Sequence, residues 1–132
     1  MVVFRRAKPK SIREQIRDIL LRLAADTSAT IVALFSKDGL PVAVYPEGKI
    51  DPVDLSGQGA AMLGACGKVG EGFGMTDIEY VLLKGKTMNV VIVTRGGYGL
   101  IVASPEPNIG YLISVARKAL SKCEEALTRT EI

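Results

Sequence analysis

The chain has 132 residues and a net charge of +3, with 48% hydrophobic and 23% charged residues and no histidine or tryptophan. This composition is typical of one globular domain, and no apolar run approaches the roughly 20 residues that span a bilayer. The lack of histidine and the two isolated cysteines, Cys66 and Cys123, argue against a zinc or iron site and against a disulfide. We therefore expect no metal and no cofactor.

The first ten residues, MVVFRRAKPK, carry four positive charges at Arg5, Arg6, Lys8 and Lys10. They do not form a signal peptide, so we expect a cytoplasmic protein. The rest of the chain sums to −1 and offers no basic face that continues the arm. Without interleaved aromatic residues the arm is a weak nucleic-acid signal, and we expect no nucleic-acid partner. We favour a flexible, solvated arm over residues 1–10, with contact to a membrane or an acidic partner as the alternative.

A helix and a hairpin follow the arm. Ser11 begins an S-x-x-E capping box, and apolar residues at spacings of three and four then predict an amphipathic helix over residues 12–25. Two β-branched, apolar runs at residues 30–36 and 41–45 flank Asp38-Gly39, a dipeptide that favours tight turns. These runs predict a β-hairpin.

A second helix and three further strands come next. Asp51 suits an N-cap and Pro52 the first helical position, so a helix is expected from here. Three apolar runs separated by glycine-containing turns then predict an antiparallel meander with strands at 79–84, 88–94 and 98–104.

A closing helix begins at Asn108 and carries an apolar stripe as far as Leu127. The element order is α-β-β-α-β-β-β-α, which predicts an α+β domain: a five-stranded antiparallel sheet with helices on its faces. We place this domain at residues 11–127, between the basic arm (1–10) and a C-terminal tail (128–132).

The central segment LSGQGAAMLGACGKVGEGFG, residues 55–74, is glycine-rich but does not match a phosphate-binding loop. A Walker loop would need Ser or Thr after Lys68, where the chain has Val69, and a glycine where it has Met62. The dinucleotide fingerprint that begins at Gly57 also fails at Met62. We therefore expect no nucleotide to bind to this segment.

A helical wheel separates this segment into two faces. The larger residues share one arc, which we predict to face the core: Leu55, Met62, Cys66 and Val69, with Leu63 on its flank. The opposite side is predicted to face outward and carries Val53, Gly57, Ala60, Ala61, Gly64, Gly67 and Lys68. Glycine inside a helix costs about 0.5–1 kcal/mol relative to alanine, so a smooth outer face indicates docking of another backbone. Close crossing over the protein's own sheet is the alternative, and it accounts only for Gly59. Residues 70–74 are expected to form the loop after the helix.

Three segments, FSKDGLPVAVYP, DLSGQGAAMLGACGKVG and VVIVTRGGYGLIVASPEPNIGYL, together resemble the Roadblock (dynein light chain) domain family over nearly all of residues 11–127. The resemblance implies a Roadblock/profilin-like sandwich that is not an enzyme. It also implies a dimer in which the third strand pairs with its counterpart and the two central helices lie side by side. Here these elements would be residues 79–84 and 52–69, which adds Tyr80 and Leu82 to the candidate interface.

Prokaryotic members of that family act with Ras-like small GTPases, which they bind over the paired central helices, in some cases stimulating GTP hydrolysis. The resemblance therefore implies a homodimeric regulator or scaffold, or a heterodimer with a second Roadblock paralogue. We assign no catalytic residue. Within the domain, Arg95 is the one arginine outside the helices, and a solvated turn residue is the favoured interpretation. The basic arm departs from the family pattern.

The sequence offers little support for two other functions, a small-molecule sensor and an enzyme. A small-molecule sensor of the profilin or PAS type would need a polar group inside an apolar cavity, and the predicted core faces offer almost none. An enzyme would need a histidine, a paired buried carboxylate or a nucleophile motif, and the sequence contains none of them. Asparagine and glutamine occur only twice each, which is consistent with a thermophilic source.

Overall fold

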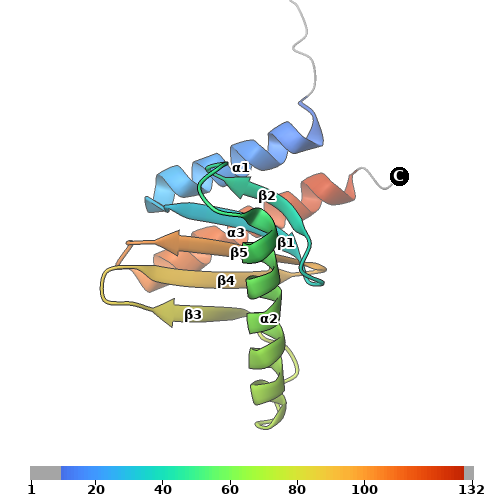
Figure 1. Ribbon diagram of the computed structural model, residues 1–132, viewed down its shortest axis with the longest axis vertical. Helices are drawn as coiled ribbons and strands as arrows, with labels where there is room; N and C mark the ends of the chain where they lie inside the picture. The colour runs from blue at the N-terminus through green and yellow to red at the C-terminus, as the bar shows by residue number, and fades with distance from the viewer. Residues whose placement is uncertain (1–9, 130–132) are drawn as a thin grey trace, which may run out of the picture.

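A computed structural model describes residues 10–129; Arg5, Arg6 and Lys8 of the basic arm and the last three residues lie outside this range. The element order matches the sequence prediction (Figure 1). Its helices and strands are α1 (Ile12–Thr27), β1 (Ile31–Ser36), β2 (Pro41–Tyr45), α2 (Pro52–Glu71), β3 (Tyr80–Lys84), β4 (Asn89–Arg95), β5 (Tyr98–Ser104) and α3 (Ile109–Thr128). Within the described residues, no helix is both long and apolar enough to cross a membrane.

Each helix begins at a polar side chain that satisfies a free backbone N–H of the first turn. Ser11, Asp51 and Asn108 accept these hydrogen bonds at 3.2, 2.9 and 3.0 Å. All three are residue types preferred at N-caps, because their oxygens replace the carbonyl partners that the first turn lacks. The predicted starts of the three helices are confirmed.

The five strands form one antiparallel sheet in the order β2-β1-β5-β4-β3. The β1–β2 hairpin turns at Gly39 and the β4–β5 hairpin at Gly96, both with a positive φ that favours glycine. β1 pairs with β5 from Ile31 to Ser36, which joins the first hairpin to the later meander. β2 and β3, the strands at the ends of this order, are therefore the edges of the sheet.

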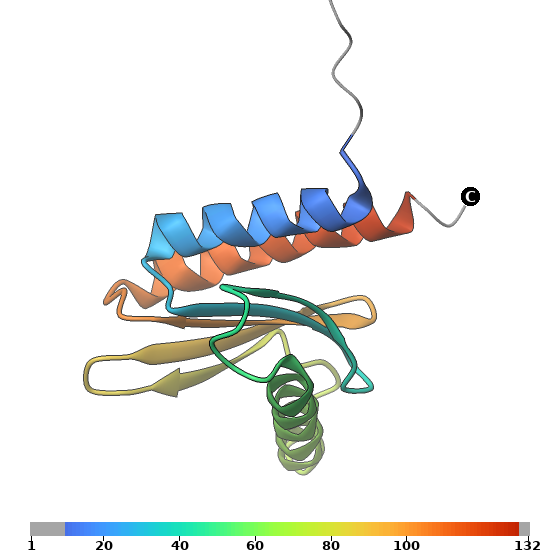
Figure 2. The ribbon, with the colours of Figure 1, turned by 45° about the horizontal axis from the view of Figure 1, so that its top comes forward.

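The helices cover the two faces of the sheet unequally, as Figure 2 shows: α1 and α3 lie side by side on one face, and α2 lies alone on the other. Successive side chains of each strand point to opposite faces of the sheet, so the strands contribute to a hydrophobic core on each side. The core under α1 and α3 includes Val32, Leu34 and Val91, and the smaller core under α2 consists of Ala33, Phe35, Ile92 and Ile101 with half-buried neighbours.

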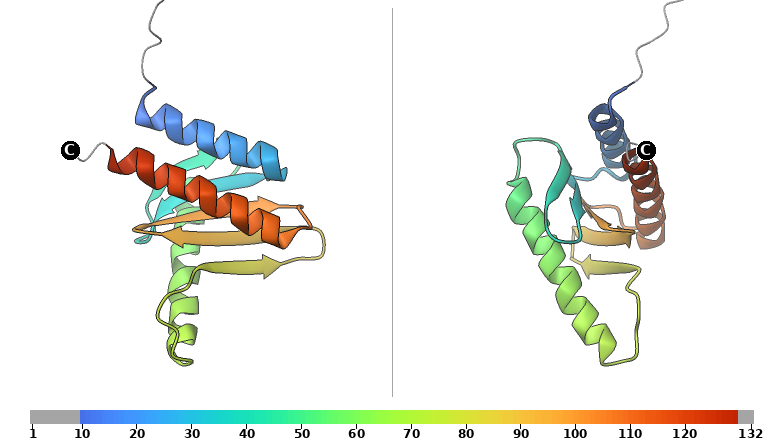
Figure 3. Two further views of the ribbon diagram at one scale, coloured as in Figure 1. Left: turned by 180° about the vertical axis from the view of Figure 1, so that it is seen from behind. Right: turned by 90° about the vertical axis from the view of Figure 1, so that its right-hand side faces the viewer.

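α2 crosses the sheet very closely at Gly59. A Cβ atom at this position would lie 2.9 Å from both Ile101 Cδ1 and Phe35 Cζ, nearer than side chains normally pack. α2 contacts β1, β2 and β5, and its C-terminal end runs out past β3 (Figure 1 and the right view of Figure 3). The interpretation of Gly59 as a close crossing is confirmed.

The predicted end of α2 is wrong by two residues. The helix continues to Glu71, and Gly70 is buried inside it rather than part of the loop. A Cβ on Gly70 would come within 3.2 Å of Met75 Cβ, because the chain turns back against the helix directly after its end. The backbone N–H of Met75 donates to Gly70 O at 2.9 Å in the same turn. Glycine is needed at position 70 for this close return, which the sequence alone does not distinguish from a loop glycine.

Gly59→Val should destabilise the protein by about 1–3 kcal/mol, because the added methyl groups would overlap Phe35 and Ile101. Urea unfolding monitored by circular dichroism measures this difference. Gly57→Ala is the matched control: nothing lies within 4 Å of its Cβ, so it should raise stability by about 0.5–1 kcal/mol. Equal stability of Gly59→Val and the unmodified protein would contradict the close crossing.

Candidate protein-interaction surface

α2 has an outer face on which added Cβ atoms would meet no other part of the chain. The helix is rotated about its axis relative to the predicted orientation, so different residues face the sheet. Ser56, Gly59 and Gly70 are buried against the sheet or the returning chain. Two predicted orientations are therefore wrong: Ala60 packs against the core under α2, and Val69 is 66% exposed. The prediction centred the inward face on the largest residues, whereas a close crossing buries the small ones.

The remaining predicted interface residues occupy two places. On the outer side of α2, Val53 is 62% exposed, and Gly57, Ala61, Gly64 and Lys68 are also exposed. Gly67 is half-buried, yet a Cβ there would meet no atom within 4 Å.

On β3, Tyr80 is 41% exposed and Leu82 is half-buried. Tyr80 lies near the C-terminal half of α2, with which it lines a common groove. Val53 and Gly57 belong to the other end of the helix. None of the α2 residues predicted for the interface lines this groove: its α2 residues are Ala65, Cys66, Val69 and Gly70. Gly64 and Gly67 line a different cleft, on the other flank of the helix.

An apolar groove of about 410 Å³ lies between the C-terminal half of α2 and β3, and the sequence analysis missed most of it. Phe73 is 84% exposed beside it, and Met75 is also exposed. No charged side chain lines the groove, which consists of Ala65, Cys66, Val69, Gly70, Phe73, Met75, Ile78, Tyr80 and Val81. A phenylalanine between glycines directly after a helix is the sequence signal that could have revealed it.

The two edges of the sheet differ in how well they could accept another strand. β2 begins with Pro41, which has no N–H, and its pairing with β1 is irregular between Leu34 and Phe35. Such features protect an edge from further pairing. β3 pairs in continuous register with β4 from Tyr80 to Lys84 and contains no proline. The outer side of β3 is therefore a regular row of unpaired backbone groups beside the apolar groove.

A charged cleft of about 560 Å³ lies on the opposite flank of α2, where the β4–β5 turn meets the segment after the helix. Arg95 lines it and forms an ion pair with Glu124 at 3.3 Å, and Arg117 pairs with Glu79 at 3.7 Å. The Arg95 side chain is more than half exposed, but the residue ends β4 rather than lying in the predicted turn, and its ion pair adds a contact to α3. In the described part of the chain, no group of three or more potential ligands is placed to hold a metal ion.

Three buried polar side chains donate hydrogen bonds to backbone carbonyls, while Asn89 Oδ1 is a buried oxygen without a partner among the described residues. Thr27 donates to Leu23 O at 2.8 Å, and Ser104 donates to Thr27 O at 2.5 Å. Asn89 donates to Glu106 O at 3.0 Å. The bonds of Ser104 and Asn89 connect the sheet to the end of α1 and to the loop that precedes α3. None of these residues lines the apolar groove. No observation specifically favours the sensor hypothesis.

Comparison with solved structures defines the fold class. MglB of Myxococcus xanthus aligns with a TM-score of 0.71 over 94% of this chain and 92% of its own, at 20% identity. A Roadblock/LC7 domain from Streptomyces avermitilis aligns with a TM-score of 0.74 over 83% and 95%, at 17% identity. An MglB solved in a tetrameric arrangement gives a TM-score of 0.74 over 90% and 95%, at 18% identity.

The chain thus has the Roadblock/LC7 fold, and the resemblance drawn from the sequence is confirmed at the level of the fold. No protein-family model matches the sequence, and no curated protein does.

The two cysteines should differ sharply in reactivity. Cys123 is fully buried, and burial raises the pKa of its thiol to about 12. Cys66 is half-buried and lines the apolar groove. With iodoacetamide at neutral pH and high dilution, where the groove is open to solvent, mass spectrometry should find modification at Cys66 and none at Cys123 while the protein remains folded. Faster labelling of Cys123 would show that the core between α3 and the sheet is not packed as described.

Proposed function

We propose that the protein is a non-enzymatic regulator that forms a homodimer through β3 and the apolar groove and binds a Ras-like small GTPase over α2. The observation that carries the first part is the open, regular β3 edge beside an uncharged groove with an exposed Phe73. The Roadblock/LC7 fold supports the second part, as does the exposed small-residue face of α2.

A second copy of the chain would both pair with the free edge of β3 and cover the apolar groove beside it. Two β3 strands paired antiparallel across a two-fold axis perpendicular to the sheet would continue it and satisfy backbone groups on both. The same axis brings the uncovered α2-side residues Val81 and Leu83 toward those of the twin. Leu83 is 44% exposed although it faces the same side as Val81 and α2, because α2 does not pack on this part of the sheet.

The apolar side chains beside the groove are sufficient in size to drive such a dimer. Val69, Phe73 and Met75 are each more than half exposed. Burial of a large apolar side chain contributes about 1.5–3 kcal/mol, and two-fold symmetry doubles the number of side chains. The total free energy gained by this burial is comparable to the cost of association in lost translational and rotational freedom, which is about 4–15 kcal/mol. An MglB with this fold is itself found in a tetrameric arrangement, which supports self-association here.

The small outer face of α2 that lies away from the groove is the place proposed for the GTPase. Gly57, Ala61 and Gly64 expose backbone there, and Val53 adds an apolar contact. Small side chains let another backbone approach closely, and Asp54, Gln58 and Lys68 supply a polar rim around them. No residue is assigned a catalytic role: Arg95 lines the same cleft as Gly64, but its side chain is engaged with Glu124. A Roadblock paralogue remains the alternative partner for β3.

Phe73→Ser should weaken self-association about tenfold or more, because it removes an exposed aromatic anchor without touching either core. Light scattering coupled to size exclusion at micromolar concentration measures the mass. The unmodified chain should run at twice its 14.1 kDa mass. Leu40→Ser, at an exposed position in the β1–β2 turn, is the matched control and should leave the dimer intact. A strictly monomeric unmodified protein would overturn the dimer.

Gly64→Arg should abolish binding to the small GTPases encoded in the same genome while leaving the fold cooperative. Nothing lies within 4 Å of a Cβ at this position, so the arginine would project outward and block a partner backbone. Isothermal calorimetry with GDP- and GTP-analogue-loaded GTPases measures the binding. Ala25→Arg, at an exposed position of α1 on the opposite face of the sheet, is the control and should bind normally. Unaltered GTPase binding by Gly64→Arg would exclude this face as the docking site.

A further inference from the structure

The charged cleft runs along the flank of α2 that adjoins the face proposed for the GTPase. Ala60, Gly64 and Gly67 line it, so small residues form much of its α2 wall. The β1–β2 turn lies at one end, since a Cβ on Gly39 would be 3.5 Å from Ala60 Cβ. Glu71 lies at the other end, about 16 Å further along the helix at the usual rise per residue. The cleft therefore has two distinct ends.

The two ends of the cleft carry opposite charges. Lys37 belongs to the β1–β2 turn, and its backbone N–H donates to Gly97 O at 2.9 Å, which joins this turn to the β4–β5 turn. Glu71 and Asp77 lie at the other end, where the chain folds back after α2. All three charged side chains are exposed. Ion pairs within the described residues involve none of them.

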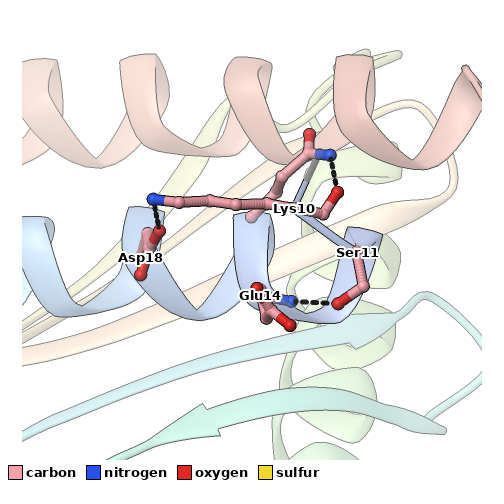
Figure 4. Close-up of polar contacts among 5 residues, drawn as sticks. Lys10, Ser11, Glu14 and Asp18 are labelled. Atoms are coloured by element: carbon pink, nitrogen blue, oxygen red, sulfur yellow. Dashed lines mark hydrogen bonds and ion pairs between the residues drawn. The ribbon is translucent and has the colours of Figure 1, made fainter. Parts of the chain in front are cut away.

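The other charged side chains of the cleft are paired within the chain. Its two arginines form the ion pairs with Glu124 and Glu79 described above. On the opposite face of the sheet, at the start of α1, the exposed Lys10 likewise donates to Asp18 at 2.5 Å (Figure 4). The charges at the two ends of the cleft lack such partners. They give the cleft a polarity that the chain itself does not neutralise.

The position of Glu71 favours a role for its charge outside the chain. It is the last residue of α2, where the partial negative charge of the helix end favours Lys or Arg. Within the described residues, no ion pair compensates its carboxylate. An acidic residue at this place is unfavourable for stability, and it is explained if the carboxylate meets a cation of a partner.

We propose that the cleft selects the partner that docks on α2, by accepting an extended segment of the GTPase with an acidic side chain at the Lys37 end and a basic side chain at the Glu71 end. This inference rests on the proposed function and deepens it. The distance between the ends suits about five extended residues at about 3.3 Å each. The small residues of the α2 wall let the backbone of the segment lie close to the helix. A segment with the reverse order of charges would place like charges together, which disfavours a wrong partner.

A reversal of polarity that conserves the net charge tests this inference with the full chain. Lys37→Glu combined with Glu71→Lys exchanges the charges of the two ends, and calorimetry with small GTPases of the same genome should show binding at least about tenfold weaker. Glu71→Lys gives the end of α2 the charge that its dipole favours, so thermal unfolding should show an intact fold. The matched control, Lys10→Asp combined with Asp18→Lys, exchanges the charges of an ion pair on the opposite face and should change the affinity less than about twofold.

The results that overturn this inference differ from those that overturn the proposed function. A GTPase affinity that the reversal leaves unchanged, or that the control lowers equally, would exclude the cleft as the site of recognition while GTPase binding itself stands. A reversal that changes the mass measured by light scattering and leaves the GTPase affinity unchanged would assign the cleft to a second copy of the chain instead. Failure of the unmodified chain to bind any small GTPase of the genome would overturn the proposed partner and this inference together.

Discussion

The close approach of α2 to the sheet at Gly59 determines most of what the surface of this protein can do. With Phe35 and Ile101 directly beneath it, the helix can lie this close to the sheet only because residue 59 has no side chain. It is held on β1, β2 and β5, so its C-terminal half extends over the other edge of the sheet. The apolar groove beside β3 and the exposed small residues on the outside are both consequences of this single contact.

The same arrangement gives the two sides of the molecule different properties. On the α2 side, an uncharged groove adjoins an open strand edge, and the net charge of residues 29–107 is negative. On the other side, two helices pack on the larger core and leave both basic and acidic side chains outward. A protein built this way can hold a partner over α2 without involving the face of the sheet that α1 and α3 cover.

The sequence predicted the elements well because their determinants are local. Caps at Ser11, Asp51 and Asn108 and the Asp38-Gly39 turn act within a few residues. The orientation of α2 was predicted wrongly, since Ala60 faces inward and Val69 outward only because of how closely the sheet lies. The groove around Phe73 also depends on tertiary placement, which brings β3 beside α2.

The central claim is that β3 pairs with a second copy of the chain, and backbone hydrogen exchange tests it most directly. In an antiparallel edge strand, alternate N–H groups point away from β4 and exchange freely unless another strand covers them. For residues 80–84 we expect the outward amides to become protected as protein concentration rises from nanomolar to micromolar, while those bonded to β4 stay protected throughout. Outward amides that exchange equally fast at every concentration would contradict the account.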